Sequence, residues 1–498
     1  MCIRGLLAAG RFVAWCAGAT AAAAHAQSLA DRPEGALSGK IVYLHAGHGW
    51  TANNLGNGSW TTQRGENFEL VEDFSNQDML TFQAESLFNA GATVVPLRPI
   101  GRQLNEVVLD NDDPGVEFIG PWSDSVSPIF FGDPGDLPYK FAGVSETESA
   151  VARYRPTLPE AGWYPVYSWT RHGFDRVEQL YRITHTGGQT AVRINHTRVG
   201  NGLVYLGTYF FDAGDAGFVE ISNESSGSGV VIADMIRFGN GMGDIDRGGG
   251  VSGQPREDEA ALYWIQAHAG QGIPSSEWRT SSSDSTATVG ASPRWAEQMN
   301  RQQSGSLSDR VFVSHHSNAG GGSARGVIAL YNGNNNPASE TPNQFLLAET
   351  LGREINDDLV QIDAAFEHDW ADRSVVTLDR TDFEFGEISN SVINNEFDAT
   401  IVERAFHDNQ LDAELILDVR VSEAVARSTT QGLVQYFRAV DGGATPLAFA
   451  PQRVEGVAAA ANSDGSVTVS WAVPASGDAP TGYRVQSSPN GFGFDAGV

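Results

Sequence analysis

The chain has very little cysteine. Among its 498 residues there are two, Cys2 and Cys16, and both lie in the first 26 positions. If that segment is removed, the remainder has no disulfide, no thiolate metal ligand and no cysteine nucleophile. Beyond the same segment, no uninterrupted apolar run reaches the roughly 20 residues that a membrane-spanning helix needs. We therefore expect no transmembrane anchor.

Basic residues are also scarce. Lys and Arg total 32 against 61 Asp and Glu, which gives a formal net charge of -29. A chain this acidic repels the phosphate backbone, so we expect no nucleic-acid partner. Docking on anionic membrane surfaces is disfavoured for the same reason. We interpret the acidity as a means of keeping a secreted protein soluble.

The N-terminal segment has the features of a secretory signal. Arg4 and Arg11 supply positive charge, and an apolar, alanine-rich run follows. Ala24-His25-Ala26 then fits the small-x-small pattern of a cleavage site. We therefore predict that residues 1–26 are a signal peptide. The mature protein would be secreted or periplasmic, in a bacterium.

The first part of the mature chain alternates strand and helix. Residues 41–44 and 92–97 are predicted strands, and residues 67–89 carry apolar side chains at helical spacing. This order is typical of a mostly parallel sheet. From 116 to 240, by contrast, short aromatic and β-branched strands recur about every ten residues, which predicts an all-β sandwich.

The α/β pattern resumes after this sandwich. Strands are predicted at 311–316 and 399–402, and helices at 257–269, 293–303, 345–359 and 421–437. We expect an α/β fold, a twisted mixed sheet flanked by helices, formed by residues 38–112 and 247–442 and interrupted by the inserted sandwich. Residues 450–498 resemble the first half of a fibronectin type III sandwich. We expect this segment to be incomplete and the chain to be a fragment of a longer protein.

Three separated residues could form one metal site. His48 follows the first strand, Glu72 begins a helical run, and His316 ends a later strand. Two imidazoles and one carboxylate form a common catalytic zinc shell, which leaves a position for water. Glu403 directly follows the predicted strand 399–402, where ligand crevices of open α/β sheets form. As a general base and acid it would complete a site for metal-assisted hydrolysis.

Four sequence blocks carry a family resemblance. They are Gly47-His48-Gly49; Glu72 with Asn76; Ser314-x-His316-x-Asn318-Ala319 with Arg325-Gly326; and Glu403 with Ala405-Phe406 and Asp412-Ala413. In this order they resemble the zinc-dependent N-acetylmuramoyl-L-alanine amidases of the amidase 3 family, over residues 38–110 and 247–442. The resemblance implies one Zn²⁺ held by His48, Glu72 and His316, with Glu403 as the catalytic carboxylate. It implies peptidoglycan as substrate, cut between N-acetylmuramic acid and L-alanine.

Three residues depart from the family pattern. His45 replaces an acidic or amide residue; it is either a partner of a metal ligand or a plain strand-end residue, and we favour the second. Trp50 replaces a glycine and could form a wall of the substrate groove. Arg404 could hold Glu403 ionised and lower its pKa. If its side chain points away, it is a surface charge.

Other polar residues near these blocks have weaker interpretations. Asn318 and Arg325 are expected to shape the substrate pocket, and His315 to point outward from its strand. Ser314 is not expected to be a nucleophile, because no base and orienting acid are evident for a triad. Specificity is expected to lie in groove loops such as residues 275–289.

The inserted segment carries a second resemblance. Its motifs are Ala152-Arg153-Tyr154, Gly162-Trp163-Tyr164-Pro165-Val166-Tyr167, His185-Thr186-Gly187-Gly188, Leu206-Gly207-Thr208-Tyr209 and Ala233-Asp234-Met235-Ile236-Arg237-Phe238. They resemble the golvesin C-terminal-like domain, a xanthan-lyase-type carbohydrate-binding module. This implies glycan binding through exposed aromatics such as Trp122, Trp163 or Trp169. For any one of these rings, however, we favour a place in the sandwich core.

Two alternatives stay open. The protein could be a zinc hydrolase of another amide on the same fold, or a catalytically inactive carbohydrate- or cell-wall-binding protein. The metal could also be another divalent ion, because availability as well as affinity decides occupancy.

Overall fold

A six-stranded mixed sheet organises the α/β part of the chain. The structure, a computed structural model, describes residues 29–53, 58–301, 307–452, 454–474, 477–480 and 482–488, with strands β1 (Arg4–Leu6) and β2 (Phe12–Ala14). The predicted signal peptide and its cleavage site thus lie largely outside the described residues. The sheet order is β24-β23-β25-β22-β4-β9. Its strands are β4 (Ile41–Ala46), β9 (Thr93–Pro96), β22 (Arg310–Asn318), β23 (Ile328–Leu330), β24 (Thr377–Leu378) and β25 (Asp398–Phe406).

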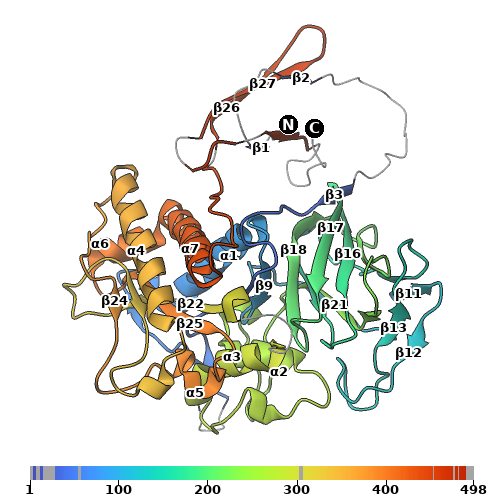
Figure 1. Cartoon of the computed structure of the whole chain (residues 1–498), viewed down its shortest axis with the longest axis horizontal. Helices are drawn as coiled ribbons and strands as arrows, with labels where there is room; N and C mark the ends of the chain where they lie inside the picture. Colours follow the sequence, from blue (N-terminus) through green and yellow to red (C-terminus); the bar gives the residue numbers. More distant parts are fainter. Residues whose placement is uncertain are drawn as a thin grey trace.

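Helices cover both faces of this sheet, as predicted. In Figure 1, α1, α4 and α7 lie on one side, and α2, α3 and α5 lie on the other. The helices are α1 (Glu72–Asn89), α2 (Ala261–His268), α3 (Asp284–Met299), α4 (Gln344–Ile362), α5 (Asn390–Ile393), α6 (Gln410–Leu417) and α7 (Val419–Val440). None of the helices within the described ranges combines the length and the apolar character of a membrane span.

Four neighbouring strands of this sheet, β25, β22, β4 and β9, run in the same direction. β22 pairs in parallel with both β4 and β25, and β4 pairs in parallel with β9. The carboxyl ends of these strands therefore meet at one edge, where open α/β sheets form ligand crevices. Because β4 precedes the inserted segment and β22 follows it, the sheet and this edge are assembled from both sides of the insert.

The insert is an assembly of facing sheets whose own strands pair antiparallel, while β3, from before the insert, pairs in parallel with β17. One sheet has the order β10-β21-β15-β18, and a second has β11-β14-β19-β16-β17 with β3 at its edge. β12, β13 and β20 form a third, smaller sheet. The strands are β3 (Leu29–Asp31), β10 (Glu106–Leu109), β11 (Val116–Ile119), β12 (Ser123–Asp124), β13 (Lys140–Gly143), β14 (Val151–Tyr154), β15 (Gly162–Trp169), β16 (Glu178–His185), β17 (Gly188–Asn195), β18 (Leu203–Phe211), β19 (Phe218–Ser222), β20 (Val230–Ala233) and β21 (Met235–Gly239).

The insert packs against the β9 edge of the mixed sheet through buried aromatic side chains. The Tyr167 hydroxyl accepts the backbone N–H of Ile100 at 2.9 Å. The indole N–H of Trp169 donates to the carbonyl of His268 at 3.1 Å. These rings sit in one continuous core with the helices beyond them. Trp169 thus belongs to the core, as favoured from the sequence, whereas Trp163 is 41% exposed and Trp122 is half-buried.

The C-terminal segment contributes a hairpin and a short strand. β26 (Glu455–Ala461) pairs with β27 (Val467–Ala472), and β28 (Arg484–Gln486) follows. β2 pairs with β27, and β1 pairs with β28. Because the residues beyond 488 lie outside the described part, the fibronectin type III resemblance stays a prediction.

Small elements complete the chain. Two short hairpins, β5 with β6 and β7 with β8, lie between β4 and α1. Their strands are β5 (Thr51–Ala52), β6 (Trp60–Thr61), β7 (Glu66–Asn67) and β8 (Leu70–Val71). Six single-turn 3₁₀ helices are η1 (Arg256–Asp258), η2 (Ser275–Glu277), η3 (Leu307–Asp309), η4 (Pro337–Ser339), η5 (Asp363–Ala365) and η6 (Gly386–Ile388).

Two helix starts differ from the apolar patterns in the sequence. α1 begins at Glu72, the residue predicted to open it, although the apolar pattern starts at residue 67; Phe68 and Glu69 adopt left-handed backbone angles that a helix excludes. α3 begins at Asp284 rather than at Pro293. The Ser283 side chain caps it by accepting the N–H of Thr286, and Pro293 is accommodated inside the helix. Residues 284–289 are therefore helical, which corrects their assignment to a groove loop.

Asp284 anchors the start of α3. Its buried carboxylate pairs with Arg247 at 2.8 Å and Arg279 at 2.6 Å, and accepts the Tyr263 hydroxyl at 2.7 Å. Burial opposes ionisation, but these partners outweigh it and lower the pKa of Asp284 to about 2.

We expect Asp284→Asn to destabilise the fold by about 2 kcal/mol at neutral pH, since hydrogen bonds to charged groups are lost. Because the pKa of Asp284 is lower in the folded than in the unfolded chain, its stabilisation is present above about pH 4 and is lost as pH falls toward 2. Thermal unfolding would be measured for the wild type and for Asp284→Asn from pH 7 to pH 2. The difference between their unfolding temperatures should disappear as the pH approaches 2. A constant difference across this range would contradict the assignment.

Candidate active site

The loop after β4 presents His48 in a strained conformation. His48 has φ 71°, which is uncommon for a residue with a side chain. Asp73, in the first turn of α1, accepts the backbone N–H of Gly49 at 2.9 Å and that of Gln63 at 2.8 Å. The buried carboxylate of Asp73 thus links the loop that contains His48 and Gly49 to the loop that contains Gln63. Strain maintained by surrounding contacts is typical of functional sites.

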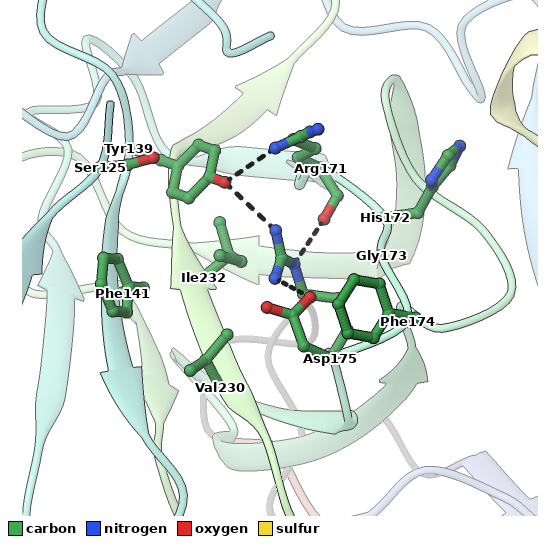
Figure 2. Close-up of a pocket in the computed structure, with 11 residues that line it drawn as sticks. Ser125, Tyr139, Phe141, Arg171, His172, Gly173, Phe174, Asp175, Val230 and Ile232 are labelled. Carbon is green, nitrogen blue, oxygen red and sulfur yellow. Dashed lines mark hydrogen bonds and ion pairs between the residues drawn. The ribbon is translucent and has the colours of Figure 1, made fainter. Parts of the chain in front are cut away.

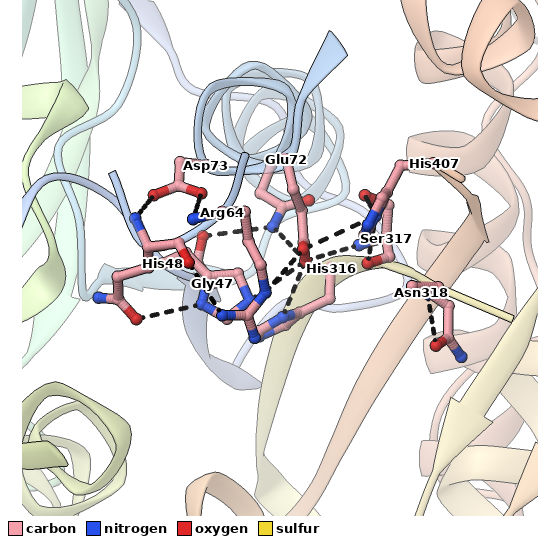
Figure 3. Close-up of polar contacts among 12 residues, drawn as sticks. Gly47, His48, Arg64, Glu72, Asp73, His316, Ser317, Asn318 and His407 are labelled. Atoms are coloured by element: carbon pink, nitrogen blue, oxygen red, sulfur yellow. Dashed lines mark hydrogen bonds and ion pairs between the residues drawn. The ribbon is translucent and has the colours of Figure 1, made fainter. Parts of the chain in front are cut away.

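Glu72 opens α1 and points into the space beside His48. Its Oε1 lies 3.3 Å from Nε2 of His48 and 3.4 Å from Nδ1 of His316. Figure 3 shows the three side chains converging. The same oxygen accepts the Ser317 N–H at 3.2 Å and the Asn76 amide at 3.3 Å. The three predicted ligands, which lie on three separate elements, are therefore brought together.

The donor set and its spacing fit a zinc ion. Two ligands of a tetrahedral zinc lie about 3.3 Å apart, given zinc–ligand distances of about 2.05 Å. The distances from Glu72 Oε1 to the two imidazole nitrogens, 3.3 and 3.4 Å, match this separation. All three ligand atoms lie within 4.8 Å of one another. Gly47 makes room for this approach, because a Cβ there would overlap the His316 ring.

A second group, His45, His316 and Glu387, overlaps with the first. Glu387 lies in η6 and is buried. Its Oε1 is 2.6 Å from His45 Nδ1, and its Oε2 is 3.2 Å from His316 Nε2. A separation of 2.6 Å is a charge-assisted hydrogen bond and is too short for two ligands of one zinc. We therefore assign Glu387 to holding the outer nitrogen of His316, while Nδ1 faces Glu72.

Carboxylates give this cluster a strong preference for a cation. Burial favours neutral His316, but Glu387 and Glu72 outweigh it and raise the pKa of His316 well above its usual range. Burial would likewise raise the pKa of Glu72, yet the imidazoles of His48 and His316 hold it well below normal. Arg64 pairs with Oε2 of Glu72 at 3.4 Å, which leaves Oε1 toward the imidazoles. A metal ion competes with protons for such a site.

Glu403 stands beside this cluster with an unpartnered oxygen. In the register of β22 with β25, Glu403 is the neighbour of His316. Its Oε2 is buried and has no hydrogen-bond partner within the described structure. Burial raises its pKa to about 8; His316 acts against this, and Glu72 and Glu387 add to it. Glu403 also lies within β25, three residues before its end, rather than directly after the strand as predicted.

The two proposed roles of Arg404 are both corrected. Arg404 is buried, so it is not a surface charge. Burial raises the pKa of Glu403, and Arg404 does not lower it, because adjacent strand residues point to opposite faces of the sheet. On the Arg404 face lies His315, which is fully buried and not outward-pointing, with both ring nitrogens unpartnered within the described residues. Burial, then Arg404, lowers the pKa of His315 to about 3.

The other sequence candidates lie around the cluster. Trp50 is half-buried and its backbone bonds to Asp258 and Ala260 in the second half of the chain. Asn318 ends β22 and in Figure 3 points away from His316. The guanidinium of Arg325 is held by Asp412 at 2.7 Å. Their effect on substrate stays a prediction.

Ser314 does have a histidine and an acid nearby, yet it does not form a triad. Its Oγ lies 2.9 Å from Nδ1 of His45, and Glu387 contacts that same nitrogen. A relay needs the hydroxyl and the carboxylate on different ring nitrogens. Ser314 is also fully buried. His45 is thus a buried member of this polar network, and not the plain strand-end residue that we favoured from the sequence.

Glu387 is the site residue that the sequence interpretation missed. It lies 71 positions from His316, in a segment without metal-ligand spacing. The only signal pointing toward it was the unusual His45, whose buried ring requires a partner.

We expect Glu387→Gln to weaken zinc binding by about 10- to 100-fold, because outer partners orient a ligand and raise its basicity. Competition with a chromogenic chelator would measure the affinity. Glu349→Gln, on the exposed surface of α4, is the matched control. Unchanged affinity in Glu387→Gln would show that this carboxylate does not support His316.

Parts of the chain are similar to solved structures. One is the N-acetylmuramyl-L-alanine amidase of Mycobacterium smegmatis, with 16% identity over 30% of this chain and 61% of that one, at a TM-score of 0.22. Another is a Paenibacillus xanthan lyase, with 28% identity over 27% of this chain and 13% of that one, at a TM-score of 0.23. The chain spans less than two thirds of either protein. Both TM-scores are too low to assign a function to this chain.

Part of the chain also has a relative in sequence. The chain is 34% identical over 149 residues to a xanthan lyase of Bacillus sp. (strain GL1), which covers 29% of this chain and 16% of that enzyme. The family model of the golvesin C-terminal domain matches residues 107–240. The resemblance predicted for the insert is therefore confirmed, with the matched segment beginning at residue 107 rather than at 116.

Proposed function

We propose that this protein is a secreted or periplasmic zinc-dependent hydrolase that cleaves the amide between N-acetylmuramic acid and L-alanine in peptidoglycan. One observation carries the proposal: His48, Glu72 and His316 converge at zinc-ligand spacing beside Glu403, whose Oε2 has no partner within the described residues. The choice of substrate rests on the four sequence blocks, which resemble the amidase 3 family. The compartment rests on the signal-like N-terminal segment.

His48, Glu72 and His316 would hold the metal, with Glu387 fixing the outer nitrogen of His316. When bound, zinc supplies a Lewis acid that lowers the pKa of water and polarises a carbonyl. The chain's own part is to fix these ligands before substrate arrives. Asp73 does so for the His48 loop, and Asn76 and Ser317 do so for Glu72.

Glu403 would move the proton. Its carboxylate accepts a proton from the attacking water, whose oxygen bonds to the lactyl carbonyl carbon. When the carbon–nitrogen bond breaks, Glu403 returns this proton to the nitrogen of the leaving L-alanine. The buried Oε2 of Glu403, which has no hydrogen-bond partner within the described residues, is placed to take and return this proton. The products are a lactyl carboxylate on the glycan and a free stem peptide.

Hydrolysis of purified peptidoglycan tests the proposal. Products would be examined by mass spectrometry for free stem peptides that begin with L-alanine, with added zinc and with chelator. Zinc-dependent release of these peptides is the expected result. Stems still attached to muramic acid, in a protein that binds zinc, would favour another amide substrate. Wall binding without turnover and without chelator sensitivity would favour the inactive wall-binding alternative.

A further inference from the structure

A pocket of about 250 Å³ lies in the insert, away from the residues of the candidate active site. The loop 171–176 after β15 forms one wall, and β13 and β20 form the others. Figure 2 shows Tyr139, Phe141 and Phe174 around it. The volume is close to the lower end of small-ligand sites, which suits one sugar unit better than a long chain.

Two guanidinium groups meet inside this pocket. Arg176 donates to the Tyr139 hydroxyl at 3.1 Å, and Arg171 donates to the same oxygen at 3.4 Å. Arg176 is buried and also pairs with Asp175 at 2.5 Å. Arg171 forms no ion pair within the described residues, and its side chain donates to the Tyr139 oxygen. Two cations against one carboxylate leave the pocket with an excess of positive charge.

This local charge is unusual for the chain. The protein has 61 acidic residues against 32 basic ones, so most arginines are expected to have a carboxylate partner. Keeping two like charges close together in a partly buried pocket is unfavourable unless an anion joins them. Arginine is also the side chain best suited to a carboxylate, because its planar fork can donate two parallel hydrogen bonds.

Phe174 adds an apolar platform at the pocket. Phe174 is 84% exposed, more than any other aromatic residue in the described part of the chain. Exposing such a ring has an unfavourable hydration free energy that a ligand could recover. Sugar rings present C–H faces to aromatic side chains, while their polar groups need hydrogen-bond partners. Phe174, Arg171 and Arg176 combine the two kinds of contact.

We propose that this pocket binds a carboxylate-bearing sugar unit of a glycan. The carboxylate contacts Arg171 and Arg176, and the sugar face lies against Phe174. Asp175 stays paired with Arg176 and accepts hydroxyl hydrogens. A neutral sugar would leave Arg171 without its anion and bind more weakly.

Two sources offer this chemistry. One is the peptidoglycan strand after stem removal, where hydrolysis of the amide leaves the muramic lactyl group as a free carboxylate. The other is a polysaccharide that contains uronic acid. The first source rests on the proposed function, because it is the product of that reaction; the pocket itself does not. If the first is bound, the insert would keep the enzyme on strands that it has already cleaved.

Binding would be measured by co-sedimentation with the full chain in a Glu403→Gln background, so that turnover does not alter the polymer. The probes are intact peptidoglycan, peptidoglycan stripped of stems by chemical or enzymatic means, polygalacturonate and neutral dextran. The variants are Arg171→Gln and Phe174→Ala. Arg193→Gln is the control, since Arg193 lies on β17 outside the pocket and pairs with Glu224.

We expect Arg171→Gln to weaken binding of a carboxylated probe by about tenfold or more, because a charge-assisted hydrogen bond is lost. Phe174→Ala should also weaken it, and Arg193→Gln should not. Preference for stripped peptidoglycan identifies the first source, and preference for polygalacturonate identifies the second. Equal binding of dextran, or carboxylated-probe binding that Arg171→Gln and Phe174→Ala leave unchanged, overturns the proposal. The peptide-release assay is separate, so either proposal can fail alone.

Discussion

Glutamine in place of Glu403 should lower the rate of stem-peptide release by about a thousandfold, while zinc binding stays at the wild-type level. The substitution keeps the shape of the side chain but removes its ability to accept a proton. Glu403 lies beside His316 in the register of β22 and β25. It is not, however, one of the three residues predicted to bind the metal. Catalysis and metal binding should therefore separate in this variant.

The separation can be measured on one preparation. Zinc content would be determined by atomic emission after dialysis, and turnover by mass spectrometry of released peptides. Glu349→Gln, which removes an exposed carboxylate on α4, should keep both properties. Because the Oε2 atom of Glu403 is buried and the pKa of this carboxyl is raised, the neutral glutamine should not destabilise the fold, and thermal unfolding would check this. Near-normal turnover in a folded, zinc-loaded Glu403→Gln would remove Glu403 from the chemistry.

The sequence could predict that His48, Glu72 and His316 come together because each lies next to a recognisable element. His48 follows a buried strand, His316 lies within another, and Glu72 begins a helix. Parallel strands bring such positions to one edge of a sheet, so local patterns and one topological rule are sufficient. The same reasoning placed Glu403 on the correct strand, although it ended that strand at residue 402, four residues early.

The sequence could not predict roles that depend on the direction in which a side chain points. Arg404 is adjacent to Glu403 in sequence, yet the alternation of the strand places it on the opposite face, next to His315. Glu387 reaches His45 and His316 from a single-turn helix that carries no periodic signal. Helix α3 was missed over its first nine residues because serine, threonine and an internal proline weaken its local preference. In each of these cases tertiary packing, and not the local sequence, determines the conformation.

Alanine in place of Gly47 should weaken zinc binding by more than about a hundredfold and abolish peptide release. Loss of an outer partner already weakens a metal site by about 10- to 100-fold, and this substitution would displace a ligand itself. A Cβ at position 47 would overlap the ring carbon and both nitrogens of His316. The ring has little freedom to move away, because Glu387 holds its Nε2 at 3.2 Å.

Gly65→Ala is the matched control for this change. Gly65 lies on the neighbouring loop, has no positive φ, and a Cβ there would meet no atom within 4 Å. It should bind zinc normally and release peptide at the wild-type rate. Thermal unfolding of both apo proteins would establish that Gly47→Ala is folded, since overpacking a buried position costs about 1–3 kcal/mol. If folded Gly47→Ala bound zinc as tightly as Gly65→Ala, His316 would not hold the metal from the position described. The assignment of the ligands would then have to move to the group of His45, His316 and Glu387, with a different orientation of the ring.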